Sequence, residues 1–100
     1  MAKRNAPYDH WGIECGPGWK ALYEPLIELC KKEGVAILQI KEKFGTLRFY
    51  ASKAPDHVRA AINDAEAKSA ETCEMCGAPG ERRSDGWIRT LCGKCAKSAS

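Results

Sequence analysis

Four cysteines near the end of this 100-residue chain constrain its fold more than any other feature. They form two pairs, Cys73 with Cys76 and Cys92 with Cys95, and 15 residues separate the pairs. Each pair offers two sulfurs from one tight turn, and the segment between them is long enough for a hairpin that brings the turns together. This spacing is typical of four thiolates that bind one zinc ion. Because four protein ligands leave no open position on the metal, we predict one structural Zn²⁺.

Two alternatives to zinc stay open at the level of sequence. The four cysteines can be buried or joined in disulfides, or they can bind iron as in rubredoxin-like sites. Residues 1–7 carry charge but lack the apolar segment of a secretory signal. We therefore expect a cytoplasmic protein, because thiols stay reduced in the cytoplasm and metal binding is favoured there over disulfides.

The other two cysteines are expected to have separate roles. Cys30 lies on the apolar face of an expected helix, so we predict a buried thiol there. Cys15 follows His10 by five residues. A second metal site at this pair would need further ligands that the sequence does not offer, so the role of Cys15 and His10 stays open.

Two helices flank the centre of the chain. The spacing of apolar residues predicts a helix over Trp19–Glu33 that Gly34 ends, and Pro25 either kinks it or lies in the first turn of a shorter helix. A second helix is expected from Pro55 to about Ala70. It carries a narrow stripe of small and branched side chains that fits against a sheet. The stripe consists of Val58, Ala61, Ile62 and Ala65.

Alternating apolar residues between the helices predict a hairpin of two strands, 35–41 and 46–51, around a four-residue loop. With that loop, the apolar face consists of the pairs Ile40–Leu47, Leu38–Phe49 and Ala36–Ala51. A slip of one residue would spoil this face. A second, shorter hairpin is expected between the cysteine pairs, with strands at 81–83 and 87–91, and Gly77 follows the first pair where positive φ is often needed.

These elements predict an α+β fold in one compact domain that spans residues 1–100. Its parts are an irregular N-terminus (1–14), a helix, an antiparallel hairpin and a helix (15–72), and a C-terminal zinc ribbon or treble-clef-like module (73–95). The second helix leads directly into Cys73 without a flexible linker, so we expect the module to be docked on the rest of the chain.

Two surfaces are candidates for contact with a partner. The polar face and tip of the first hairpin and the arginines of the second combine positive charge with aromatic rings, as nucleic-acid or protein recognition requires. These partner-binding candidates are Lys41, Lys43, Phe44, Arg48, Tyr50, Arg82, Arg83 and Arg89. The alternative is an ordinary solvated surface on which arginine stems cover apolar groups.

Catalysis is not expected. His10 and His57 are the only histidines, and a histidine in the first turn of a helix is typically exposed or capping. The sequence lacks a glycine-rich loop of the kind that binds phosphates, and the histidine-rich pattern of a compact nuclease. No apolar run approaches the roughly 20 residues of a membrane span. We therefore predict neither an enzyme nor a membrane partner, and no small-molecule substrate.

From Cys15 to Cys95 the chain resembles a family of small, uncharacterised proteins encoded by phages, prophages and bacteria. The matching stretches are residues 15–19 (CGPGW), 39–50 (QIKEKFGTLRFY), 72–80 (TCEMCGAPG) and 86–95 (GWIRTLCGKC). The resemblance implies a phage-like origin and a zinc ribbon, and nothing catalytic. The C-terminal part is also similar to the zinc finger of the DksA/TraR group, which bind RNA polymerase, but the acidic helix tip of that group has no counterpart here.

The sequence thus favours a non-catalytic zinc protein that binds and modulates host machinery, such as an anti-defence inhibitor of a CRISPR effector. The alternatives are direct nucleic-acid binding and a regulator acting on RNA polymerase. The formal charge is +3, from 16 basic and 13 acidic residues. Four thiolates and one Zn²⁺ would contribute −4 + 2 = −2, which brings the protein near +1. This weak charge favours a protein target over nucleic acid.

Overall fold

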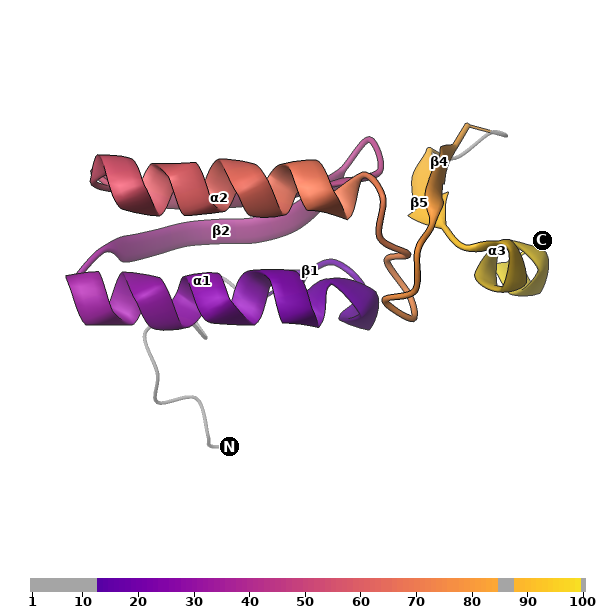
Figure 1. Ribbon diagram of the computed structural model, residues 1–100, viewed down its shortest axis with the longest axis horizontal. Helices are drawn as coiled ribbons and strands as arrows, with labels where there is room; N and C mark the ends of the chain where they lie inside the picture. Colours follow the sequence, from indigo (N-terminus) through magenta and orange to yellow (C-terminus); the bar gives the residue numbers. More distant parts are fainter. Residues whose placement is uncertain (1–12, 85–87, 100) are drawn as a thin grey trace.

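The computed structural model describes residues 13–84 and 88–99, and Figure 1 shows their arrangement. Two helices, α1 and α2, lie side by side against a three-stranded sheet, and the cysteine-rich part lies beyond the ends of both. The elements in chain order are β1 (Ile13–Glu14), the 3-10 turn η2 (Pro17–Trp19), α1 (Lys20–Glu33), β2 (Ala36–Lys43), β3 (Thr46–Ser52), α2 (Asp56–Ser69), β4 (Glu81–Arg83), β5 (Arg89–Leu91) and α3 (Gly93–Ala99). The fold is a mixed α/β globule with a helix, a hairpin and a cluster of four cysteines.

Helix α1 ends where its sequence predicts. Gly34 adopts the left-handed conformation with φ of 71°, and its N–H caps the carbonyls of Cys30 and Lys31. Pro25 lies inside the helix, so the helix does not begin near Glu24. The missing N–H of Pro25 leaves the carbonyl of Ala21 without its helical partner, which the packing of α1 must offset.

The core lies between the two helices and the inner face of the sheet. Trp19, Cys30, Ile40 and Leu47 are completely buried there, and Cys30 is therefore the buried thiol that its helical position predicts. The stripe on α2 also faces this core. Val58, Ile62 and Ala65 are buried, and Ala61 packs against them partly exposed.

The register of the hairpin differs from the prediction by two residues. The strands continue to Lys43 and Thr46, which pair across a two-residue turn, so Ile40 lies opposite Phe49 and not opposite Leu47. A shift of two residues keeps every side chain on its face, and the core positions of β3 are unaffected.

A bulge in β2 overturns the prediction for Leu38. The ladder shifts between Ile37 and Gln39, so the alternation of sides changes there. Ile37 packs against the core in place of Leu38, whose side chain is 56% exposed. The expected pair of Ala36 with Ala51 is also wrong, because Ala36 pairs with Ser52.

Two short elements were not predicted from the sequence. Residues 13–14, expected to be irregular, form β1, which pairs in parallel with Ile40 and Lys41 of β2. Helix α3 begins at Gly93, in a segment that has no apolar stripe. The predictions for residues 1–12, and for Trp87 as the start of the last strand, lie outside the described residues.

Side chains of α2 accept hydrogen bonds from backbone N–H groups on the outer edge of β3. The N–H of Leu47 donates to Ser69 Oγ and the N–H of Phe49 donates to Glu66 Oε2, each at 2.8 Å. Ser69 Oγ in turn donates to the carbonyl of Glu66 at 2.6 Å. Because these acceptors belong to α2, the helix blocks this part of the sheet edge from pairing with another strand.

Substitution Ser69→Ala tests this edge contact. Leu47 and Ser69 are completely buried, so removal of the hydroxyl leaves a buried N–H without an acceptor. We expect a loss of about 1–3 kcal/mol in the free energy of unfolding, measured by urea denaturation. Ala67→Ser makes the reverse exchange at an exposed position of the same helix. It should lower the free energy of unfolding by only a few tenths of a kcal/mol. Equal effects of the two substitutions would contradict a role for the Ser69 hydroxyl.

Candidate metal centre

The structure brings the four predicted cysteines together. Their sulfur atoms all lie within 4.8 Å of one another, and those of Cys76 and Cys92 are 3.6 Å apart. Cys73 and Cys76 come from the turn between α2 and β4, whereas Cys92 follows β5 and Cys95 lies in the first turn of α3. Cys73 is completely buried and Cys76 is exposed, so the cluster lies at the surface with one side in the protein.

Tight turns aim the sulfurs at one point. In the first turn the N–H of Gly77 donates to the carbonyl of Cys73 at 2.9 Å, and Gly77 has the positive φ, 85°, that its position predicts. In the second, the N–H of Cys95 donates to the sulfur of Cys92 at 3.4 Å. Hydrogen bonds of this kind stabilise thiolates, the form in which cysteine binds a metal.

The cluster favours ionisation of Cys73. Burial raises the pKa of this thiol, but hydrogen bonds from the backbone N–H groups of Cys92, Cys76 and Met75 outweigh burial and lower the pKa to about 6. The neighbouring sulfurs of Cys73, Cys92 and Cys76 raise the pKa of Cys95 to about 12. Four thiolates this close repel one another, and a divalent cation is the kind of ligand that offsets this repulsion.

The turn of the first pair is docked on the start of α1. The N–H of Gly18 donates to the carbonyl of Glu74 at 2.6 Å, and the indole N–H of Trp19 donates to the carbonyl of Thr72 at 2.8 Å. A β-carbon on Gly18 would overlap the carbonyl oxygen of Cys73, and one on Gly16 would lie 2.5 Å from the carbonyl oxygen of Glu74. The two glycines therefore allow a backbone contact that other residues would prevent.

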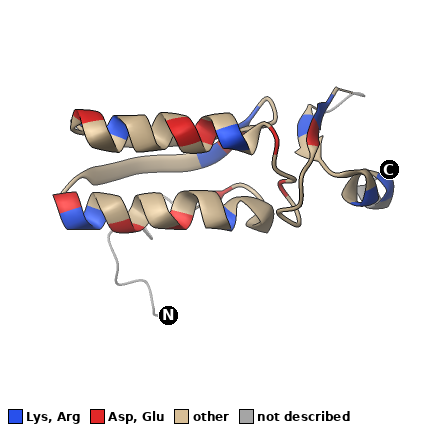
Figure 2. Ribbon diagram, viewed as in Figure 1, with Lys and Arg blue, Asp and Glu red and all other residues tan. Residues whose placement is uncertain are grey.

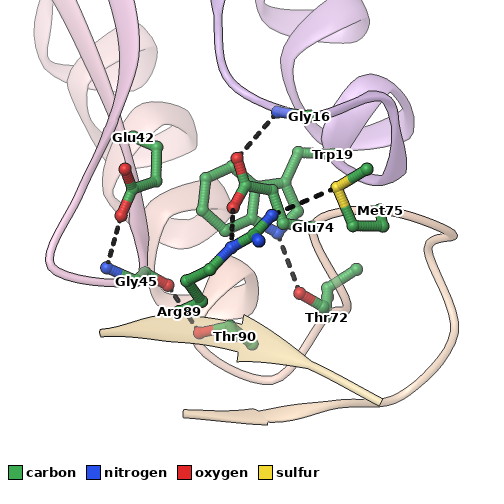
Figure 3. A network of polar contacts seen from close by, with 9 residues as sticks. All are labelled: Gly16, Trp19, Glu42, Gly45, Thr72, Glu74, Met75, Arg89 and Thr90. Carbon is green, nitrogen blue, oxygen red and sulfur yellow. Dashed lines mark hydrogen bonds and ion pairs between the residues drawn. The ribbon is translucent and has the colours of Figure 1, made fainter. Parts of the chain in front are cut away.

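Glu74 is the buried charge at this contact. In Figure 3 its side chain lies between Gly16, before α1, and Arg89 of β5, and only 8% of the side chain is exposed. Its Oε2 accepts the N–H of Gly16 at 2.8 Å, and its Oε1 is 3.9 Å from Nε of Arg89. Arg89 also donates to the sulfur of Met75 at 3.3 Å. The carboxylate thus joins the corner before α1 to the turn of the first cysteine pair and to β5.

A second set of contacts fixes the tip of the long hairpin to the module. Thr90 Oγ1 donates to the carbonyl of Gly45 at 2.5 Å, and Nε of Arg82 donates to the carbonyl of Phe44 at 3.0 Å. The N–H of Gly45 donates to Glu42 Oε2 at 2.8 Å, so both backbone groups of Gly45 are engaged (Figure 3).

The candidate partner residues fall into two groups. The β2–β3 hairpin carries the first group, Lys41, Lys43, Arg48 and Tyr50, with Lys41 opposite Arg48. In Figure 2 the basic end of this hairpin lies next to the β4–β5 hairpin, which is also basic. The structure joins the groups through Arg82 and Phe44. Arg83 and Arg89 are instead held within the module, since Nε of Arg83 donates to the carbonyl of Leu91.

The remaining candidates do not join the cluster. Burial, the charge of Glu74 and that of Glu42 raise the pKa of Cys15 to about 12, which disfavours the thiolate, the form in which cysteine binds a metal. Nε2 of His57 is 3.3 Å from Oε2 of Glu33. This pair lies where α1 ends and α2 begins, at the opposite end of the two helices from the cysteines (Figure 1). His10 is outside the described residues.

Sequence reasoning missed the residues that dock the cluster, namely Gly16, Gly18, Glu74 and Thr90. The signal for Gly16 and Gly18 was the Gly-Pro-Gly motif, which we interpreted only as a helix start. The motif also permits a backbone contact with residues 55 or more positions away in sequence. Nothing in the sequence marked Glu74 as the acid that would be buried.

Comparisons with protein family models, with curated proteins and with solved structures found no match to this chain. In the described part of the chain, no helix combines the length and the apolar character that a membrane crossing requires.

Substitution Gly18→Ala tests the docking of the cluster. The added methyl group meets backbone atoms that cannot rotate away, so we expect a loss of about 1–3 kcal/mol in the free energy of unfolding, by denaturant titration. Gly93→Ala is the matched control, because nothing lies within 4 Å of its β-carbon position, and it should change stability by less than about 0.5 kcal/mol. A neutral Gly18→Ala variant would contradict the close contact.

Proposed function

We propose that Cys73, Cys76, Cys92 and Cys95 bind one structural Zn²⁺. Sulfurs at the corners of a tetrahedron with bonds of about 2.3 Å lie about 3.8 Å apart, and the Cys76–Cys92 separation of 3.6 Å supports this geometry. Zinc would supply a cross-link between the two cysteine pairs, and four sulfur ligands would leave it no position for a substrate. A helix that begins within the second pair favours a treble-clef-like module over a simple zinc ribbon.

Metal analysis tests the identity of the ion. We expect about one zinc per chain in the purified protein and, after removal by a chelator, a lower Tm and a loss of ordered structure, because metal binding contributes to folding. Cys76→Ser should lower the zinc content, whereas Cys15→Ser, outside the cluster, should not. Iron in place of zinc, or a Tm that the chelator leaves unchanged, would contradict this proposal.

We propose that the zinc-stabilised protein acts by binding a host protein, and has no catalytic activity of its own. The observation that carries this proposal is the exposure of large apolar side chains beside cations at the hairpin. Leu38, Phe44 and Tyr50 are each at least 40% exposed, and Lys41, Lys43 and Arg48 lie among them. Aromatic rings and arginine are the residue types that anchor protein interfaces.

The resemblance to phage-encoded proteins supports a target in the bacterial cytoplasm. The target classes that we propose are a defence complex such as a CRISPR effector, a nuclease, or RNA polymerase. The protein would then modulate or inhibit its target by occupying a surface, since the proposed zinc is structural.

A second candidate function is direct nucleic-acid binding. It is favoured by Lys41 opposite Arg48 on the sheet, with Tyr50 on the same face of β3 as Arg48. Such a face offers phosphate contacts together with a ring on which a base can stack. The proposed zinc site argues against an extended binding surface for a nucleic-acid strand, because four thiolates and Zn²⁺ would place a charge of −2 beside this surface.

Affinity capture separates the two functions. We expect the immobilised protein to retain one host protein from a nuclease-treated lysate, and to show no measurable affinity for mixed-sequence DNA or RNA at low salt. Nucleic-acid binding that weakens steeply as salt increases would support the second candidate instead. Failure to retain any protein, with or without nuclease, would contradict the first.

A further inference from the structure

The tip of the long hairpin is strained and exposed at the same residue. Phe44 and Gly45 form a two-residue turn in which both have positive φ, 54° and 84°, as in a type I′ turn. Asparagine, aspartate and glycine favour the first of these positions, whereas a bulky side chain there is a conformational outlier. Phe44 is nevertheless 55% exposed, and Nζ of Lys43 lies over its ring, 5.6 Å from the ring centre.

A second unfavourable feature lies beside the first. Lys41 and Arg48 are directly opposite on the ladder, where like charges destabilise a sheet. Glu14 of β1 is the register neighbour of Lys41. In the described part of the chain, however, Lys41, Lys43, Arg48 and Arg82 form no ion pair with any carboxylate. The carboxylates of residues 13–84 and 88–99 therefore form no ion pair with the four cations near the hairpin tip.

The same tip is fixed in place. Glu42 Oε2 holds the N–H of Gly45, and Thr90 and Arg82 hold the carbonyls of Gly45 and Phe44. A rigid, prearranged tip loses little conformational entropy when it binds. Strain that the surrounding structure maintains at an exposed aromatic side chain points to a use outside the chain.

We propose that Phe44 is the central anchor of a protein interface, inserted into an apolar pocket of a partner whose surrounding surface is acidic. Nζ of Lys43 lies over the ring, Arg82 donates to the carbonyl of Phe44, and Lys41 and Arg48 lie opposite each other on the same hairpin. These four cations would pair with the carboxylates of that partner. This inference rests on the proposed binding function and gives it a residue and a partner chemistry. The rings of Phe44 and Tyr50 suit a base as well as an apolar pocket, but the exposed side chains Leu38 and Ile13 are aliphatic and favour a protein surface over nucleic acid.

Stability and binding should respond in opposite directions at this position. Phe44→Asn places a residue suited to the left-handed conformation in the turn, so we expect the Tm to rise by a few degrees while affinity for the captured host protein falls about tenfold or more. Arg48→Glu should also weaken binding, whereas Arg59→Glu, an exposed arginine on α2, should not. A Phe44→Asn variant that binds as well as the original protein would overturn the proposal.

Photo-crosslinking identifies the chemistry of the partner. The probe is p-benzoyl-phenylalanine at position 44, with the same probe at exposed Glu28 on α1 as the control. We expect a protein adduct from position 44 only, at a peptide rich in aspartate and glutamate. An adduct with nucleic acid, or with a peptide that lacks acidic residues, would overturn the proposal. A host protein that is captured but crosslinks at position 28 and not at 44 would overturn this inference and leave the binding function standing, whereas capture of nothing would remove both.

Discussion

The backbone contact between Gly18 and the Cys73–Glu74 turn is the interaction on which the rest of this structure depends. A small chain has little core to stabilise it, and here the core of the helices and the sheet ends at Trp19, whose indole N–H bonds directly to the segment that leads into the cysteines. The absence of side chains at Gly16 and Gly18 lets the two backbones meet. The cysteine cluster is therefore attached to the body of the fold through a close backbone contact, one buried carboxylate and the side-chain hydrogen bonds of Trp19 and Thr90.

This attachment links the proposed zinc to the proposed binding surface. The turn that carries Cys73 also receives β5, since the N–H of Glu74 donates to the carbonyl of Thr90 at 2.9 Å. Thr90 then holds Gly45 at the hairpin tip, so a short path of hydrogen bonds connects a candidate metal ligand to Phe44. Zinc would thus hold the hairpin tip in its strained shape without contacting a partner itself.

Much of the local structure could be predicted from the sequence, because it follows from local patterns. Gly34 ends α1 as predicted, and the spacing of the four cysteines predicts the cluster that they form. The hairpin register was predicted wrongly because the turn places Phe44 in a conformation that its residue type disfavours, and because the bulge at Leu38 interrupts the alternation. The docking contacts join residues 58 positions apart, such as Gly16 and Glu74, and no local pattern encodes such a contact.

Hydrogen exchange before and after metal removal tests the central claim most directly, namely that the cysteine cluster and the helix–sheet body are one cooperative unit. The amide of Gly18 and the indole N–H of Trp19 report on the docking contact, and the amide of Leu47 reports on the core. If the cluster and the body are one unit, chelation raises the exchange rate at all three sites together. Fast exchange confined to the cysteine turns, with Gly18, Trp19 and Leu47 as protected as before, would contradict it.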